Sequence, residues 1–530
     1  MGKKNLALII EANQGYIRNT DKNKNFSAQN NILFSAMTQT YIPLLNMMNR
    51  LRDEKISFKI GLVLCPAICE SFSDEEIINQ YIDHLDNLIT LGKKEIARCK
   101  KNEYFDQAQS CLDHIEKTKT DFTEKYSSDL LSAFKSLAKD DYIELIPTAA
   151  TYAYLPHYAD FIEALNAQVE TGLFSHKHFF GSAGEGFWIP HAAWDRNLEW
   201  VIRSYGVNYT ILDARSILFA KKAPETGIFT PVRCRNSLVV FGKDPDTDEE
   251  IFGEEGFCKN QCYRWQERDI GFDLPQKEIA SFFGKNDARI ETGFKYWAIA
   301  DEDEENLVPY NKDEAAEQTV KDALTFYENK NERLEKACEL LDGKDASLVC
   351  VINARMLGQK WHEGIQWLEN VIRCIDSKKG FELAHCKDLI ANQFELEKIE
   401  PYPCSSNGLG YGEDMLSNAN SWMIRYTRKA TERMIDLADR FPSESSLKER
   451  LLNMAAKQVL LAQSGNWQEM INEGNMPDFV EGQFKDEILS FTKVFDSLAS
   501  NTVSTEWLTG CEQKNKIFPW LNYRIFARKH

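Results

Sequence analysis

The chain has too few basic residues for a protein that binds nucleic acid. It carries 63 Lys and Arg residues against 81 Asp and Glu residues, which gives a formal net charge of −18. Phosphate backbones and anionic lipid surfaces are bound by basic faces. We therefore expect neither nucleic acid nor a membrane as a partner, whereas a neutral polymer is compatible with this charge.

Long apolar runs are also missing. The apolar run at residues 6–10 is interrupted by Glu11, so it is too short for the apolar region of a secretory signal. No other stretch approaches the roughly 18 apolar residues that span a bilayer. The sequence predicts a soluble protein of the cytoplasm.

The cysteines lack the spacing of a zinc site. There are 13 of them, an odd number for a disulfide framework. Cys65 and Cys69 are separated by three residues, as are Cys258 and Cys262, and neither pair has a second pair at zinc-site spacing. We expect reduced thiols, no metal site and no cofactor.

What the chain does contain, up to about residue 381, is an alternation of short apolar runs with longer stretches of helical periodicity. The apolar runs that predict buried strands are at 6–10, 58–65, 142–147, 209–212 and 347–352. Alternation of this kind favours an α/β fold with a parallel sheet, in which functional side chains lie on the loops that follow the strands. Beyond residue 381, helical periodicity predominates, notably at 415–441 and 446–464, and predicts a helical C-terminal domain.

Two segments carry a family resemblance. Residues 186–194 read G-F-W-I-P-H-A-A-W and resemble the motif G-F-W-L-P-E-C-A-Y of glycoside hydrolase family 57, of the α-1,4-glucan branching-enzyme type. Residues 351–364 resemble that family's F-D-x-E-L-F-G-H-W-W-F-E-G. The resemblance implies that the catalytic nucleophile position, a Glu in the family, is His191 here. It also implies that the acid/base position, an Asp in the family, is Asn353.

The resemblance covers nearly the whole chain. Residues 40–45, 268–273 and 292–296 are similar to the family segments T-Y-I-P-L-L, R-D-I-G-F-D and T-G-I-K-Y. The implied fold is an incomplete, seven-stranded (β/α) barrel with a small helical insertion and an all-helical C-terminal domain. On this basis we expect four parts: barrel at 1–190, inserted helical subdomain at 191–235, barrel at 236–380 and C-terminal helical domain at 381–530.

The departures from the family cluster at its active site. The first strand's H-A-H is Glu11-Ala12-Asn13 here, so Glu11 is a new carboxylate beside the substituted positions. The resemblance leaves a set of remnants as candidate α-glucan-binding residues: Trp188, Trp194, Arg264, Trp361, Glu363 and Trp467. Tryptophan rings offer flat faces on which sugars stack, although they fill protein cores as often.

Three functions are compatible with these substitutions. A retaining glycosidase needs one carboxylate as nucleophile and a second carboxyl as acid/base, and an amide at Asn353 cannot transfer the proton. The first hypothesis is therefore a catalytically degenerate homologue that acts in α-glucan or oligosaccharide binding or in regulation. The second is a repurposed enzyme that uses Glu11 and His191 as an acid/base pair or, with Asn13, as a weak metal site. The third is an α-glucan branching enzyme or glucanotransferase that is still active.

Overall fold

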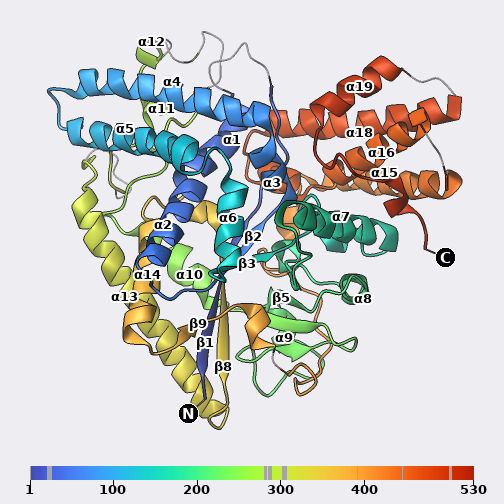
Figure 1. Cartoon of the computed structure of the whole chain (residues 1–530), viewed down its shortest axis with the longest axis horizontal. Helices are drawn as coiled ribbons and strands as arrows, with labels where there is room; N and C mark the ends of the chain where they lie inside the picture. The colour runs from blue at the N-terminus through green and yellow to red at the C-terminus, as the bar shows by residue number, and fades with distance from the viewer. Residues whose placement is uncertain are drawn as a thin grey trace.

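The computed structural model describes residues 2–20, 27–279, 283, 289–300, 307–390, 392–443, 446–500 and 504–529. Its centre is a parallel sheet that curls almost into a barrel, with helices around it and a group of helices at one side (Figure 1). The predicted fold class is confirmed.

Seven parallel strands form the barrel in the spatial order β3-β2-β1-β8-β7-β5-β4. Two short strands, β6 (Val232–Arg233) and β9 (Glu382–Leu383), pair with β7 and β1. The barrel strands are β1 (Lys4–Ala12), β2 (Ile60–Leu64), β3 (Ile143–Ile146), β4 (Gly186–Phe187), β5 (Tyr209–Asp213), β7 (Val239–Lys243) and β8 (Ala346–Asn353). All five apolar runs predicted as strands lie in this sheet.

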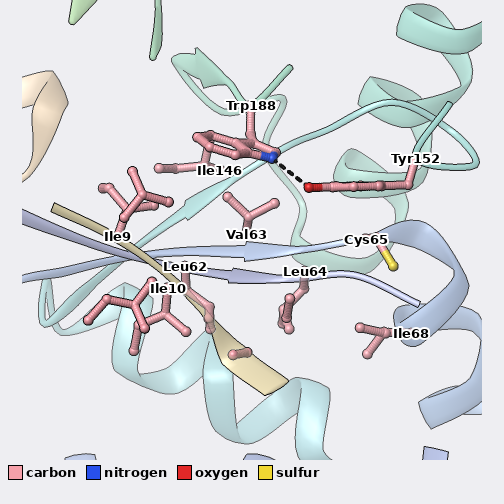
Figure 2. Close-up of a cluster of buried hydrophobic side chains, with 14 of the residues drawn as sticks. Ile9, Ile10, Leu62, Val63, Leu64, Cys65, Ile68, Ile146, Tyr152 and Trp188 are labelled. Carbon is pink, nitrogen blue, oxygen red and sulfur yellow. Dashed lines mark hydrogen bonds between the residues drawn. The ribbon is translucent and has the colours of Figure 1, made fainter. Parts of the chain in front are cut away.

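The central strands are apolar on both faces because both faces are covered. Figure 2 shows Ile9 and Val63 on the side of the sheet that carries Trp188, and Ile10 and Leu62 on the other side. All five side chains are at most 4% exposed. Glu11 follows Ile9 by two positions, so the pleat turns its side chain to the face that carries Trp188.

The two edge strands of the barrel meet at a short contact. Just beyond β3 and β4, Thr148 and Trp188 form an isolated parallel bridge. The backbone N–H of Trp188 donates to the carbonyl of Pro147 at 2.8 Å, and the Thr148 hydroxyl donates to the carbonyl of Trp188 at 2.8 Å. We call this contact between Thr148 and Trp188 the seam between β3 and β4. Helix α7 (Ile162–Phe180) packs directly on the seam, since a Cβ at Gly172 would lie 2.0 Å from the carbonyl oxygen of Thr148.

The remaining helices of the barrel surround the sheet. Their bounds are α1 (Ala28–Ala36), α2 (Ile42–Asp53), α3 (Pro66–Ser73), α4 (Glu75–Cys99), α5 (Phe105–Thr120), α6 (Leu130–Lys139), α8 (Arg196–Ser204), α9 (Ala214–Leu218), α10 (Asp246–Phe252), α11 (Ile270–Asp273), α12 (Gln276–Ile279), α13 (Lys312–Leu340) and α14 (Gly364–Lys378). A five-residue π-helix, η1 (Met37–Tyr41), joins α1 to α2.

The helical excursions differ from the expected arrangement. The range 191–235, which we expected as a helical insertion, contains α8 and α9 but also β5, which pairs with β4 and β7 in the sheet. A long helical hairpin, α4 and α5, extends from the barrel after β2 instead (Figure 1). The boundaries of the four parts remain predictions.

The C-terminal helices lie together, in orange and red, at the right of Figure 1. They are α15 (Ser421–Arg440), α16 (Ser446–Ala462), α17 (Gly465–Asn472), α18 (Pro477–Ser500) and α19 (Thr505–Lys514). The loop before α17 reaches the barrel, because the N–H of Gly465 donates to the carbonyl of Tyr152 at 3.3 Å. None of the described helices has the length and hydropathy of a membrane span.

Candidate functional site

The two altered positions of the barrel strands lie side by side. The parallel register of β1 and β8 pairs Glu11 with Asn353 at the carboxyl ends of both strands. The Asn353 amide donates to Glu11 Oε2 at 3.3 Å, and its Oδ1 accepts the backbone N–H of Arg355 at 2.9 Å. Asn353 is thus held from both ends, by a carboxyl group and by the turn that it caps.

A chain of amides leads from Glu11 to a second carboxyl group. The Asn13 amide donates to Glu11 Oε1 at 2.8 Å, and the Asn466 amide donates to Asn13 Oδ1 at 2.6 Å. Asn466 also lies 3.3 Å from Glu469 Oε2. Glu11 and Glu469 are therefore connected through two amides across the contact between the barrel and helix α17.

His191 completes this cluster. Its Nδ1 lies 3.5 Å from Glu469 Oε1, and its Nε2 has no hydrogen-bond partner among the described residues. His191 and Ala192 both have positive φ, 59° and 48°, a conformation that costs energy for residues other than glycine. The N–H of Ser406, donating to the carbonyl of His191 at 2.8 Å, holds the turn in place.

Two buried groups of this cluster, Glu469 and His191, are largely uncharged at neutral pH. Burial, together with the nearby charge of Glu11, raises the pKa of Glu469 to about 8. Burial also raises the pKa of Glu11, although the Asn13 and Tyr152 side chains oppose the shift. Burial lowers the pKa of His191 to about 4, although the Asn407 side chain, as an acceptor for the protonated ring, opposes the shift. Glu469 and His191 therefore face each other as a neutral acid and a neutral imidazole.

The centre has little contact with solvent. Glu11 and His191 are 4% and 7% exposed. Beside them, a cavity of about 20 Å³ lies between Asn13, Arg355, Asn466 and Glu469, and a volume of this size holds about one water molecule. In this conformation the side chains of the centre bind one another in a hydrogen-bonded network.

The four candidate tryptophans are buried. Trp188, Trp194, Trp361 and Trp467 are 4%, 2%, 1% and 0% exposed. The Trp188 indole N–H donates to the Tyr152 hydroxyl at 3.1 Å (Figure 2). Since none of these rings presents a face to solvent, a glucan chain could stack on them only after the surrounding loops had moved.

Trp467 has a structural role that can be tested. Its ring lies so close to Gly15 that a Cβ there would come within 2.8 Å, and its Nε1 donates to Glu487 Oε2 at 3.2 Å. Trp467→Phe should lower the free energy of unfolding by about 1–3 kcal/mol, because it leaves the Oε2 atom of buried Glu487 without its donor, while Oε1 keeps the Gln483 amide. Urea unfolding measures this, with Trp200→Phe at a 65% exposed position as the matched control. Equal stability of the two variants would contradict the assignment.

Arg264 and Glu363 belong to a different part of the molecule. The backbone N–H of Arg264 donates to Glu363 Oε1 at 3.2 Å, and both side chains are at least nine-tenths buried. Arg264 lines a separate, larger cavity whose walls include none of Glu11, His191 and Asn353. The structure therefore groups Glu11, His191 and Asn353 with the substituted centre and separates Arg264 from it.

Glu469 was not predicted as a site residue. It lies on α17 close to Trp467, which the family resemblance marks as a candidate, and three positions after Asn466, a spacing at which side chains share one helix face. Its closeness to Trp467 in the sequence is the signal that could have found it. The expected pair of Glu11 with His191 is not formed by a hydrogen bond, since Glu11 bonds Asn13 and Asn353 while His191 approaches Glu469. No three His, Cys, Asp or Glu side chains converge on a possible metal position within the described part of the chain.

Comparisons with known proteins agree with this fold. Residues 7–402 match the family Glycosyl hydrolase family 57, and residues 426–526 match the family 1,4-alpha-glucan branching enzyme, C-terminal. The chain is 22% identical over 507 residues to the 1,4-alpha-glucan branching enzyme TK1436 of Thermococcus kodakarensis, covering 89% of this chain and 70% of that protein.

Two solved structures cover essentially the whole chain. The alpha-amylase AmyC from Thermotoga maritima superposes with a TM-score of 0.91 at 26% identity, covering 100% of this chain and 99% of that one. The GH57-type branching enzyme from Pyrococcus horikoshii superposes with a TM-score of 0.87 at 19% identity, covering 99% and 97%. At this identity the second likeness shows the fold alone.

Proposed function

Because the chain belongs to glycosyl hydrolase family 57 and is similar to branching enzymes, we propose that it is a catalytically degenerate member that acts in α-glucan or oligosaccharide binding or in regulation. The observation that carries this proposal is the hydrogen-bonded centre. An imidazole and an amide stand where the family resemblance implies the nucleophile and the acid/base, and both are fixed to other residues of the network.

The chemistry of these groups supports the loss of glucan cleavage. A neutral imidazole at His191 brings no negative charge to an oxocarbenium-like transition state, and Asn353 has no proton to transfer near pH 7. Loss of a general acid/base alone typically lowers the rate by about 10²–10⁴. Glu11 and His191 are also buried, at 4% and 7% exposed, so a sugar has little access to them in this conformation.

The wild-type protein should therefore bind amylose without converting it. After overnight incubation, branch points and reducing ends should stay at the level of a protein-free control, while co-sedimentation with insoluble amylose should retain the protein. Conversion of amylose would overturn the proposal and favour a branching enzyme or glucanotransferase that is still active. Absence of both binding and conversion would leave no role in glucan binding.

A second candidate is a repurposed enzyme at the same centre. The observation that favours it is the presence of Glu11 and Glu469, two carboxyl groups whose pKa values are raised, with neutral His191 beside the second. Raised carboxyl pKa values are typical of general acids. Hydrolysis of 4-nitrophenyl α-glucoside by the wild type, abolished in Glu469→Gln, would favour this candidate over the first.

A further inference from the structure

A second cavity, of about 790 Å³, lies outside the substituted centre. Its walls come from α1, η1 and α2 on one side, α5 on another, and the segments around Arg264, Lys295 and His362. A volume of this size is that of a small-molecule site. It is separate from the amide network, so what it binds is a question distinct from the proposed function.

Two buried cations line this cavity. Arg264 is 7% exposed and Lys295 is 1% exposed. Among the described residues, no carboxylate lies within 4.0 Å of the Arg264 guanidinium, and its Nε has no hydrogen-bond partner. Lys295 donates to the carbonyl of Gln266 and lies 3.7 Å from Glu291. A buried guanidinium without an ion-pair partner is costly unless a bound anion completes it.

The acidic groups nearby do not neutralise these cations fully. Asp269 accepts the N–H groups of Gly271, Thr292 and Gly293 at 2.7–3.0 Å and the Thr292 hydroxyl at 2.7 Å, so its oxygens are fully used. Burial raises the pKa of Glu363, which favours its neutral form. The acidic residues that line the cavity itself are exposed or half-buried: Asp106, Asp113, Asp121, Glu291 and Glu369.

The histidines of the wall add no positive charge. Burial and the nearby Arg264 lower the pKa of His114 to about 4, and the same causes hold the pKa of His362 well below its usual value. Both rings are neutral at pH 7, so they serve as hydrogen-bond donors and acceptors. Burial lowers the pKa of Lys295, against the nearby charges of Glu291 and Asp269. The permanent positive charge deep in the cavity is therefore that of Arg264, and Lys295 is a second hydrogen-bond donor whose positive charge a bound anion would favour.

The rest of the wall suits a polyhydroxylated molecule. Amide and hydroxyl side chains of Gln39, Gln107 and Thr118 line it, and the side-chain oxygens of the two glutamines have no hydrogen-bond partner among the described residues. Gln39 lies in the π-helix η1, a type of segment that is frequent at functional sites. Residues 292 and 293 form another part of the wall, and their backbone N–H groups donate to the Asp269 carboxylate. These hydrogen bonds fix that part of the wall, so the cavity is largely preformed.

We propose that this cavity binds a phosphorylated monosaccharide, with the phosphate at Arg264 and Lys295 and the sugar hydroxyls at the amides and hydroxyls of the wall. A phosphate monoester carries close to two negative charges at pH 7, which would pair with Arg264 and favour the charged form of Lys295. Guanidinium groups bind phosphate with two parallel hydrogen bonds. The site would make the protein responsive to a sugar phosphate at a position other than the substituted centre.

Isothermal titration calorimetry with glucose 1-phosphate tests this proposal on the full-length protein. The wild type should bind saturably, and Arg264→Gln should bind at least about tenfold more weakly, which corresponds to about 1.4 kcal/mol. Ser110→Trp, on the exposed side of α5 at the cavity wall, should weaken binding as much by narrowing the space. Arg428→Gln, which removes the same charge from a surface ion pair with Asp160, is the matched control and should bind like the wild type.

Separate titrations with glucose and with inorganic phosphate identify which half of the ligand is recognised. We expect both to bind at least about tenfold more weakly than glucose 1-phosphate. Absence of saturable heat with the wild type, or equal affinity in all variants, would overturn the proposal. If inorganic phosphate bound as tightly as glucose 1-phosphate, the proposed recognition of the sugar would be overturned. If Arg264→Gln fails to fold by circular dichroism, Ser110→Trp decides, because its side chain is exposed.

Discussion

The double variant His191→Glu with Asn353→Asp is expected to leave amylose unconverted, although it restores both carboxylates that the family resemblance implies. Each new carboxyl group would face an existing one. The carboxyl group at position 353 would replace an amide whose nitrogen lies 3.3 Å from Glu11 Oε2. The carboxyl group at position 191 would replace an imidazole whose Nδ1 lies 3.5 Å from Glu469 Oε1. Carboxyl groups this close cannot all ionise, so they share protons instead of serving as nucleophile and acid.

The same variant should also be less stable than the wild type, by an amount that grows with pH. Each pair of facing carboxyl groups retains a proton in the folded protein that it releases in the unfolded chain, so the loss increases as the pH rises above about 4.5. Branch formation and reducing ends measure activity, and urea unfolding at pH 5 and pH 8 measures stability. Matched amide variants, His191→Gln with Asn353→Gln, control for the change of shape. Conversion of amylose by the double variant would show that an intact glucan cleft opens in solution.

Glu469→Gln is expected to stabilise the protein at pH 8 and to change little at pH 5. The pKa of Glu469 is about 8 in the folded protein against an ordinary value of 4.5. Between these values the unfolded chain releases a proton that the folded protein retains, so the wild type loses stability as the pH rises through this window. Within this window, the free energy of unfolding of the wild type falls by at most about 1.4 kcal/mol for each pH unit. A quarter of the Glu469 side chain is exposed, and solvent screens part of the effect. We therefore expect the free energy of unfolding of the variant to exceed that of the wild type by about 2–4 kcal/mol at pH 8.

Chemical unfolding at pH 5, 6.5 and 8 tests this expectation, with Glu473→Gln as the matched control at an exposed carboxyl one turn further on. The gain should increase with pH. A constant difference, or a loss at pH 8, would contradict the raised pKa and would mean that the carboxylate of Glu469 stabilises the cluster. Glu487, whose pKa burial raises to about 8, should give a gain of the same sign when it is replaced by Gln.

The fold could be predicted because its signals are local. Strands such as β1 and β2 are buried on both faces and appear in the sequence as uninterrupted apolar runs. Helices α15 and α16 show the periodicity of packed amphipathic segments. The periodicity of α4 and α5 predicts two helices after β2, but it does not predict that they form a hairpin that extends from the barrel.

The candidate site could be predicted only in part. Glu11, His191 and Asn353 follow strands, and the resemblance aligned them with catalytic positions. Glu469 lies more than a hundred residues beyond Asn353 in the sequence and reaches the centre only because α17 packs against the barrel. The burial of the candidate tryptophans could not be predicted either. A tryptophan that fills a core and one that stacks on a sugar look the same in the sequence.

The seam between β3 and β4 determines how the closed centre could be reached. The ladders that join β1 to β2 and to β8 are long, whereas β7 and β8 share one register pair and β3 and β4 meet at the bridge between Thr148 and Trp188. Trp188 leads directly into the turn that carries His191, and its indole donates to Tyr152. Movement along the line between β3 and β4 would therefore part the hydrogen bonds of Trp188 with Pro147, Thr148 and Tyr152, and it would displace α7, which packs on this line. The turn that carries His191 would move with Trp188.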